Sequence, residues 1–215
     1  MHHLKSSLAV AILLTIGAIC TQSADAQIVA FTGKDSNSPE TMAFVALEDI
    51  PSGTKIFFTA DDYDNTTGQF TGGLEGTVLL TTSGTIATGT VIQIQETAAN
   101  VFTVTGNPGT AVHVGPGNWS AGSGDPMYAF SASNDATPAT TVTEVHAMLW
   151  VTDATFGTRD PSTGTVSHPN AIVVDNGFLA ANAAADFTGD RSNATFTSLA
   201  DSSNFTAGDN VLDLT

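Results

Sequence analysis

Short apolar runs broken by turn-forming residues constrain the fold of this chain most. Runs of roughly five to eight apolar and β-branched residues recur along the sequence, and Gly, Pro, Asn or Asp separates them, a pattern typical of antiparallel β-structure. Strands are therefore predicted at nine places, which are residues 27–32, 41–47, 54–59, 76–82, 90–95, 101–105, 127–131, 143–151 and 171–174.

The periodicity within these runs indicates which faces are buried. Residues 91–95 alternate strictly, so Ile92 and Ile94 are predicted on one buried face, with Gln93 and Gln95 on a wet face. The run 56–58 is continuously apolar, and we expect both of its faces to be covered. Only residues 177–185 are typical of a helix. The predicted fold class is mainly β, an antiparallel β-sandwich with at most one short helix.

The first 26 residues have the features of a secretory signal peptide. A basic start precedes an apolar run over residues 8–19, and the small residues Ala24 and Ala26 follow it. The apolar run is too short for a lasting membrane anchor. We therefore expect cleavage before Gln27, a single β-sandwich domain over residues 27–215, and a secreted, extracellular or cell-surface location without membrane insertion. The one cysteine, Cys20, lies in the leader, so the mature domain has no thiol.

The charge of the chain excludes some partners. The formal net charge is −16, with only five lysines and arginines in all. So few cations cannot neutralise a phosphate backbone, which argues against nucleic acid binding. An anionic membrane surface would repel the protein as well. A folded extracellular protein remains, whose acidic surface keeps it soluble or attracts divalent cations.

Several segments together resemble a known kind of domain. They are residues 28–33, 42–54 and 56–59, followed by 74–77, 124–125 and 128–130. These segments are similar to a poorly characterised domain of secreted bacterial cell-surface proteins, whose members resemble Ig-like or lamin-tail-like β-sandwiches. The matching motifs are turns and strands, so the resemblance implies a fold and a location rather than an activity. Tyr63 departs from the pattern, in which Trp is commoner.

An acidic loop after the apolar run 56–58 is the strongest candidate metal site. Its oxygen-bearing side chains are those of Asp61, Asp62, Asp64 and Asn65, and Glu75 follows a short loop away. Hard oxygen ligands suit Ca²⁺. The spacing does not complete an EF-hand, because Gly68 falls at the wrong position and no Glu closes the loop. The alternative is a solvated turn in which Asp and Asn cap backbone groups.

Aromatic residues on loops suggest a second interpretation, which is polysaccharide binding. The faces of Trp and Tyr rings pack well on sugars. Trp119, on a loop rich in Gly and Pro, and Tyr63, in the acidic loop, are the candidate ligand-binding residues. The alternative for Trp119 is that it anchors its loop, because large aromatic side chains usually bury most of their area.

No pattern of residues assigns a catalytic role. His113, His146 and His168 are scattered, and His146 lies in an apolar run typical of a packed strand. The Gly-rich segment 122–124 lacks the Gly-x-Ser-x-Gly spacing of a nucleophile elbow. Two suitably separated carboxylates would suffice for a glycosidase, and the acids of this chain leave that open.

The apolar segment next to the expected cleavage site offers a means of self-association. A free terminal strand can add to the sheet edge of a neighbour. The segment consists of Gln27, Ile28, Val29, Ala30 and Phe31. The alternative is that it pairs within its own domain. The function we expect first is that of a structural or interaction protein of the cell surface or matrix, which self-assembles and is stabilised by calcium. The second is a carbohydrate-binding module, and the third is an extracellular hydrolase.

Overall fold

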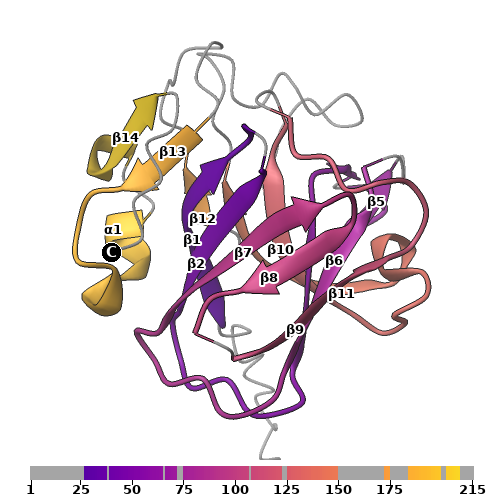
Figure 1. Cartoon of the computed structure of the whole chain (residues 1–215), viewed down its shortest axis with the longest axis horizontal. Coiled ribbons are helices and arrows are strands. Elements are labelled where there is room, and N and C mark those ends of the chain that lie inside the picture. Colours follow the sequence, from indigo (N-terminus) through magenta and orange to yellow (C-terminus); the bar gives the residue numbers. More distant parts are fainter. Residues whose placement is uncertain are drawn as a thin grey trace, which may run out of the picture.

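The computed structural model describes residues 27–37, 39–64, 66–71, 75–106, 108–122, 125–149, 172–174, 184–199 and 202–208. Two six-stranded sheets form the body of this part of the chain, and a two-stranded hairpin lies beside them (Figure 1). The predicted leader, residues 1–26, lies outside the described residues. The fold is a mainly β-sandwich, as the sequence predicts.

The first sheet contains both early and late strands of the chain. Its order is β14 (Phe205–Gly208), β13 (Ala184–Phe187), β1 (Val29–Asp35), β2 (Thr41–Ala46), β7 (Val91–Ala98) and β8 (Val101–Val104). All of its described pairings are antiparallel. The register of β1 against β2 shifts between Phe31 and Gly33, where Thr32 forms a bulge.

The second sheet carries the candidate site. Its order is β12 (Ile172–Val174), β11 (Val142–Leu149), β10 (Met127–Ala132), β3 (Lys55–Thr59), β6 (Thr77–Thr82) and β9 (Gly109–Val114). Its described pairings are antiparallel except for β11 with β12, which is parallel. The separate hairpin pairs β4 (Asp62–Asp64) with β5 (Gln69–Thr71).

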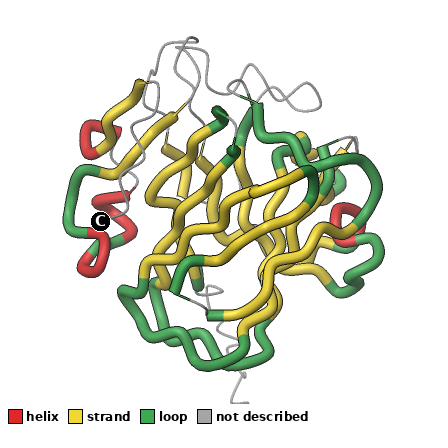
Figure 2. The backbone as a smooth tube through the Cα atoms, viewed as in Figure 1, coloured by secondary structure: helices red, strands yellow, loops and turns green. Residues whose placement is uncertain are grey.

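Helical structure is short and peripheral in the described part of the chain (Figure 2). It comprises α1 (Phe196–Leu199) and three 3₁₀ turns, η1 (Pro138–Thr140), η2 (Arg191–Asn193) and η3 (Ser202–Asn204). Most of the helix predicted over 177–185 lies outside the described residues. Its last two residues, Ala184 and Ala185, belong to β13, so the prediction is wrong there. None of the described helices has the length and apolar character needed to cross a membrane.

The predicted strands agree well with the structure where both can be compared. Each of the nine predicted runs overlaps a described strand. These strands are β1, β2, β3, β6, β7, β8, β10, β11 and β12. The expected alternation in β7 is confirmed, because Ile92 and Ile94 are each 1% exposed. The strands β4, β5, β9, β13 and β14 were not predicted, and most of them are short or rich in Gly, Thr and Ala.

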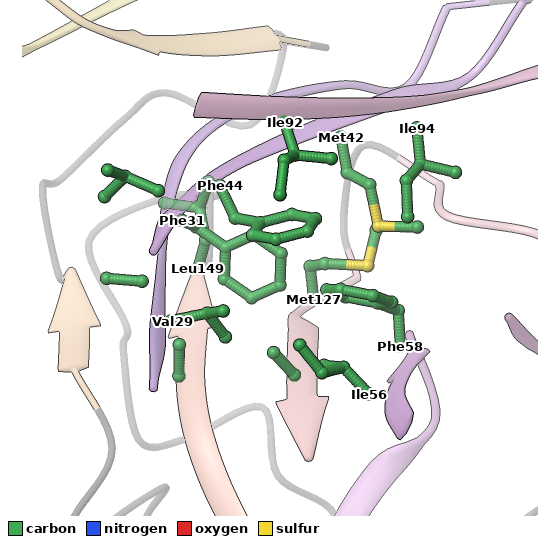
Figure 3. Close-up of a cluster of buried hydrophobic side chains, with 14 of the residues drawn as sticks. Val29, Phe31, Met42, Phe44, Ile56, Phe58, Ile92, Ile94, Met127 and Leu149 are labelled. Atoms are coloured by element: carbon green, nitrogen blue, oxygen red, sulfur yellow. The ribbon is translucent and has the colours of Figure 1, made fainter. Parts of the chain in front are cut away.

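The main core lies between the two sheets. Phe58 of β3 contacts rings from the first sheet, with centroid distances of 5.1 Å to Phe44 and 6.2 Å to Phe31. Figure 3 shows Met42 of β2 and Met127 of β10 pointing toward one another across the same layer. Close packing of this kind is the principal source of stability for a domain without disulfides.

A second core covers the outer face of the second sheet. Phe57, Tyr128 and Phe130 point outward from β3 and β10, where Phe70 of the β4–β5 hairpin packs over them. The Phe70 ring lies 4.7 Å from that of Phe130 and 5.1 Å from that of Tyr128. Both faces of β3 are thus covered, as its apolar run predicts: Ile56, Phe57 and Phe58 are all 0% exposed.

Candidate ligand site

A cavity of about 250 Å³ opens beside this second core. Segments far apart in the sequence form its walls: the end of β3, strand β5, the start of β6, the loop after β9, and the η1 turn. The lining residues are Asp61, Phe70, Thr77, Gly115, Pro116, Thr137, Pro138, Ala139 and Thr140.

A buried threonine positions the acidic wall of the cavity. The Thr59 hydroxyl donates to the Gly76 carbonyl at 2.9 Å and accepts from the Asp61 backbone N–H at 3.2 Å. It thereby joins the end of β3 to the start of β6. Asp61, the next residue but one, is only 4% exposed, and its Oδ1 lies 3.4 Å from the Glu75 backbone nitrogen. The Asp61 carboxylate is therefore fixed beside the Glu75 backbone, in a residue that lines the cavity.

Aromatic packing and one hydrogen bond position the opposite wall. The Phe70 ring is fixed edge-on against Tyr63, at a centroid distance of 5.2 Å. Gln69, beside it on β5, accepts a hydrogen bond from the Val142 backbone N–H at 2.8 Å. This bond ties the hairpin to the segment that follows η1. The hairpin and the η1 turn thus form one wall rather than two independent loops.

The lining combines three kinds of chemical group. Phe70, Pro116, Pro138 and Ala139 supply apolar surface, and Thr77, Thr137 and Thr140 are the hydroxyl-bearing residues. Asp61 is the one ionisable residue of the lining, and an ionised carboxylate accepts hydrogen bonds without donating any. The cavity therefore suits a small molecule that has both an apolar face and hydrogen-bond donors.

Acidic residues next to the cavity interact electrostatically. The pKa of Glu75 is raised to about 7, first because burial disfavours its charged form and then because Asp125, Asp61 and Asp62 repel that charge. Lys34 acts in the opposite direction and lowers this pKa. Glu75 consequently changes charge near neutral pH, close enough to Asp61 for the two carboxylates to interact.

Glu75→Gln is expected to change how stability depends on pH. The pKa of Glu75 lies higher in the folded chain than in the unfolded chain, so its contribution to stability is present at acidic pH and is lost as pH rises through about 7. Chemical unfolding at several pH values should show that the variant lacks this loss, which falls between about pH 4.5 and 7. Glu48→Gln, at an exposed glutamate, is the control. Identical pH profiles for the Glu75 variant and the wild type would contradict the assignment.

Lys34 is buried at the same end of the sandwich and holds the Gly-rich loop before β10. Its side chain is 0% exposed, and its Nζ donates to the carbonyls of Gly122 at 2.8 Å and Asp125 at 2.7 Å. Burial lowers its pKa to about 8, against the opposing attraction of Asp125, Glu40 and Glu75. The buried ammonium group therefore fixes this loop by donating hydrogen bonds to two of its backbone carbonyls.

Two further contacts hold the same loop. Glu40 accepts a hydrogen bond from the Ala121 backbone N–H at 2.9 Å, and burial raises the pKa of this glutamate. Gly76 adopts a φ of +67°, and a Cβ there would lie 2.8 Å from the Trp119 nitrogen and 2.9 Å from the Asn118 carbonyl carbon. The start of β6 and the loop therefore fit together only because residue 76 has no side chain.

The acidic residues predicted to bind a metal are divided between two environments. Asp61 lines the cavity and its Oδ1 lies near the Glu75 backbone nitrogen. Asp64 instead accepts hydrogen bonds from the Thr66 N–H at 2.8 Å and the Thr67 hydroxyl at 3.0 Å. Asp62 lies on β4, and Asn65 is outside the described residues. Within the described ranges, no three His, Cys, Asp or Glu side chains are grouped closely enough to hold a metal ion. Calcium binding stays a prediction.

The two aromatic residues predicted to bind a ligand are both buried. Trp119 is 7% exposed, packs edge-on against Phe102 at 5.9 Å, and donates its backbone N–H to Asn100 Oδ1 at 2.8 Å. It anchors its loop, as the alternative interpretation expected. Tyr63 is 5% exposed and contacts Phe70. The aromatic residue that lines the cavity is Phe70, which sequence reasoning missed.

The segment predicted for self-association pairs inside its own chain. After Gln27 and Ile28, residues Val29, Ala30 and Phe31 pair with Ala46, Val45 and Phe44 of β2, and all three are at most 2% exposed. This is the alternative that the sequence left open. The segment is thus not a free strand, and self-association itself stays a prediction.

A second group of polar residues was not predicted from the sequence. Ser131 of β10 lies with its Oγ 2.8 Å from Nε2 of His146 on β11. Nδ1 of the same imidazole is 3.6 Å from Oε1 of Glu144. The only sequence signal was the Glu-x-His spacing in a run otherwise predicted to be buried.

Comparison with known proteins gives no match to a protein-family model, a curated protein or a solved structure. The class of this protein is therefore defined by its own fold and site. It is a β-sandwich with a small, partly acidic cavity on the outer face of one sheet.

Proposed function

We propose that this protein is an exported carbohydrate-binding module that holds one sugar residue in the cavity beside Phe70. The observation that carries the proposal is that a buried acid, Asp61, and an aromatic residue, Phe70, line the same cavity of about 250 Å³. This is the binding function that the sequence favoured second. The sequence also led us to expect an interaction role at the cell surface, and in this proposal the cavity is where that interaction takes place.

The chemistry of a pyranose matches these walls. One face of the ring consists of C–H groups, which pack on aromatic and other apolar surface. Its hydroxyl groups donate to a carboxylate, and hydrogen bonds to charged groups are worth about 1.5–3 kcal/mol. In this proposal Asp61 provides the acceptor, and the hydroxyl-bearing residues Thr77 and Thr140 line the same cavity.

Size and charge restrict the ligand further. Sites for drug-sized molecules measure about 300–1,000 Å³, so this cavity suits a single sugar residue rather than a buried oligosaccharide. The rest of a polysaccharide chain would lie outside the cavity. A protein of net charge −16 whose cavity contains a carboxylate repels anionic glycans. Neutral polysaccharides are therefore the proposed ligands.

Asp61→Asn is expected to weaken binding by about 10-fold or more, since the amide replaces a charged acceptor with a neutral group of the same shape. Binding is measured by retention on a panel of neutral polysaccharides, followed by titration calorimetry with the best ligand. Asp62→Asn is the matched control, because it removes the same charge one residue away from a side chain that does not line the cavity.

Two results would contradict the proposal. One is that no neutral polysaccharide retains the folded wild-type protein. The other is that the Asp61 and Asp62 variants lose equal affinity, because this would indicate a general electrostatic effect rather than a contact in the cavity.

A further inference from the structure

The Ser131, His146 and Glu144 group lies on two adjacent strands in a defined register. Ser131 of β10 is directly opposite Glu144 of β11. The neighbouring pair is Phe130 with Val145, and the next is Ala129 with Ala147, so His146 is the extra residue of a bulge. Bulges commonly redirect a side chain. This one places an imidazole between a hydroxyl and a carboxylate.

The order of groups is that of a nucleophile, a base and an orienting acid. The Ser131 Oγ to His146 Nε2 distance of 2.8 Å is a hydrogen bond. Glu144 Oε1 lies 3.6 Å from the other ring nitrogen, Nδ1. A carboxylate on that side favours the tautomer that carries its proton on Nδ1, which leaves Nε2 as the acceptor of the serine proton. The same roles define the serine–histidine–acid triad on several unrelated folds.

The exposure of the three residues also suits catalysis. His146 is 2% exposed, whereas the Glu144 side chain is 20% exposed and Ser131 is partly exposed. The base is thus shielded from water while the hydroxyl lies nearer the surface. Ser131 alternates along β10 with Phe130 and Ala132, which both pack in the outer core. It therefore lies on the opposite face of the sheet from the cavity proposed to bind sugar.

We infer that Ser131 is the nucleophile of an acyl-transfer site that hydrolyses small carboxylic esters, with His146 as general base and Glu144 as its orienting acid. Ser131 Oγ attacks the ester carbonyl carbon as its proton passes to His146 Nε2. The C–O bond to the alcohol breaks, and His146 returns the proton to the departing alcohol. Water then attacks the acyl-serine, again through His146, and releases the acid and the free serine.

The test is covalent labelling of the folded mature chain with a fluorophosphonate, together with hydrolysis of p-nitrophenyl acetate. We expect one adduct, located by peptide mass spectrometry at Ser131, and its loss in Ser131→Ala. Glu144→Gln is expected to slow labelling by about 10-fold or more, since it removes the charge that orients the base. Ser133→Ala, at an exposed serine two residues away, is the control and should label as the wild type does.

Thermal unfolding of each variant shows whether the fold is retained, and the wild-type adduct tests the inference even if a variant fails to fold. A wild-type protein that stays unlabelled after prolonged incubation would overturn the inference. So would an adduct distributed over several serines, or a folded Glu144→Gln variant that reacts at the wild-type rate. These results are independent of sugar binding, which depends on the other face of the sheet.

Discussion

Gly76→Ala is expected to lower the free energy of unfolding by about 3 kcal/mol. Two costs add: a non-glycine residue in the left-handed region costs roughly 1–2 kcal/mol, and overpacking typically costs about 1–3 kcal/mol. The new methyl group would meet backbone atoms of Asn118 and Trp119 at 2.9 Å and 2.8 Å, and backbone cannot move aside as a flexible side chain can. Urea unfolding monitored by circular dichroism measures the change.

Two other glycines separate these costs. Gly53 has a φ of +83° with nothing within 4 Å of its hypothetical Cβ, so Gly53→Ala should show the backbone cost alone, about 1 kcal/mol. Gly84 has open space and no left-handed φ, and its alanine variant should change stability little. If Gly76→Ala costs no more than Gly53→Ala, the close packing of the loop against β6 is wrong.

Lys34→Met is expected to destabilise the protein modestly at pH 7 and strongly at pH 10. The variant leaves the Gly122 and Asp125 carbonyls without their donor, at about 1–3 kcal/mol each. It also removes an ammonium whose burial lowers its pKa from 10.5 to about 8. Removing this group avoids the cost of burying its charge, which is roughly 3 kcal/mol at neutral pH. The two effects nearly offset at pH 7, leaving a loss of about 1 kcal/mol.

The pKa of Lys34 determines in which direction the stability difference between the wild type and Lys34→Met changes with pH. Between about pH 8 and 10.5 the unfolded chain binds the Lys34 proton more tightly than the folded chain, so rising pH stabilises the wild type. The methionine variant lacks that gain, and its deficit should grow to roughly 4 kcal/mol at pH 10. Lys55→Met, at an exposed lysine paired with Asp135, is the control. A deficit that is the same at pH 7 and pH 10 would contradict the buried charge at Lys34.

Local sequence pattern predicted the strands but not what lies on top of them. The run Ile56 to Phe58 was expected to be covered on both faces, and it is. The segment that covers the outer face is the β4–β5 hairpin. Its strands are only three residues long, which is too short for a periodic signal in the sequence. Phe70 therefore could not be recognised as part of a site.

The side-chain groups at the two sites depend on contacts across long stretches of chain. Asp61 was singled out because acids cluster around it, but its partners in the cavity wall come from as far as residue 140. Ser131 and His146 are brought together by a strand pairing and a bulge, and neither has a sequence signature at that separation. In the sequence, Lys34 is only one of five lysines and arginines, and its burial depends on the loop before β10.

The second sheet has apolar side chains on both faces. The residues that pack between the sheets are therefore different from those that form the cavity. Residues between the sheets, such as Phe44 and Phe58, must satisfy a tightly filled interior. The pocket walls come mainly from a small hairpin, a 3₁₀ turn and loops added on the far side. Substitutions there change the cavity while the central layer stays intact, so the proposed sugar specificity can be altered on an unchanged scaffold.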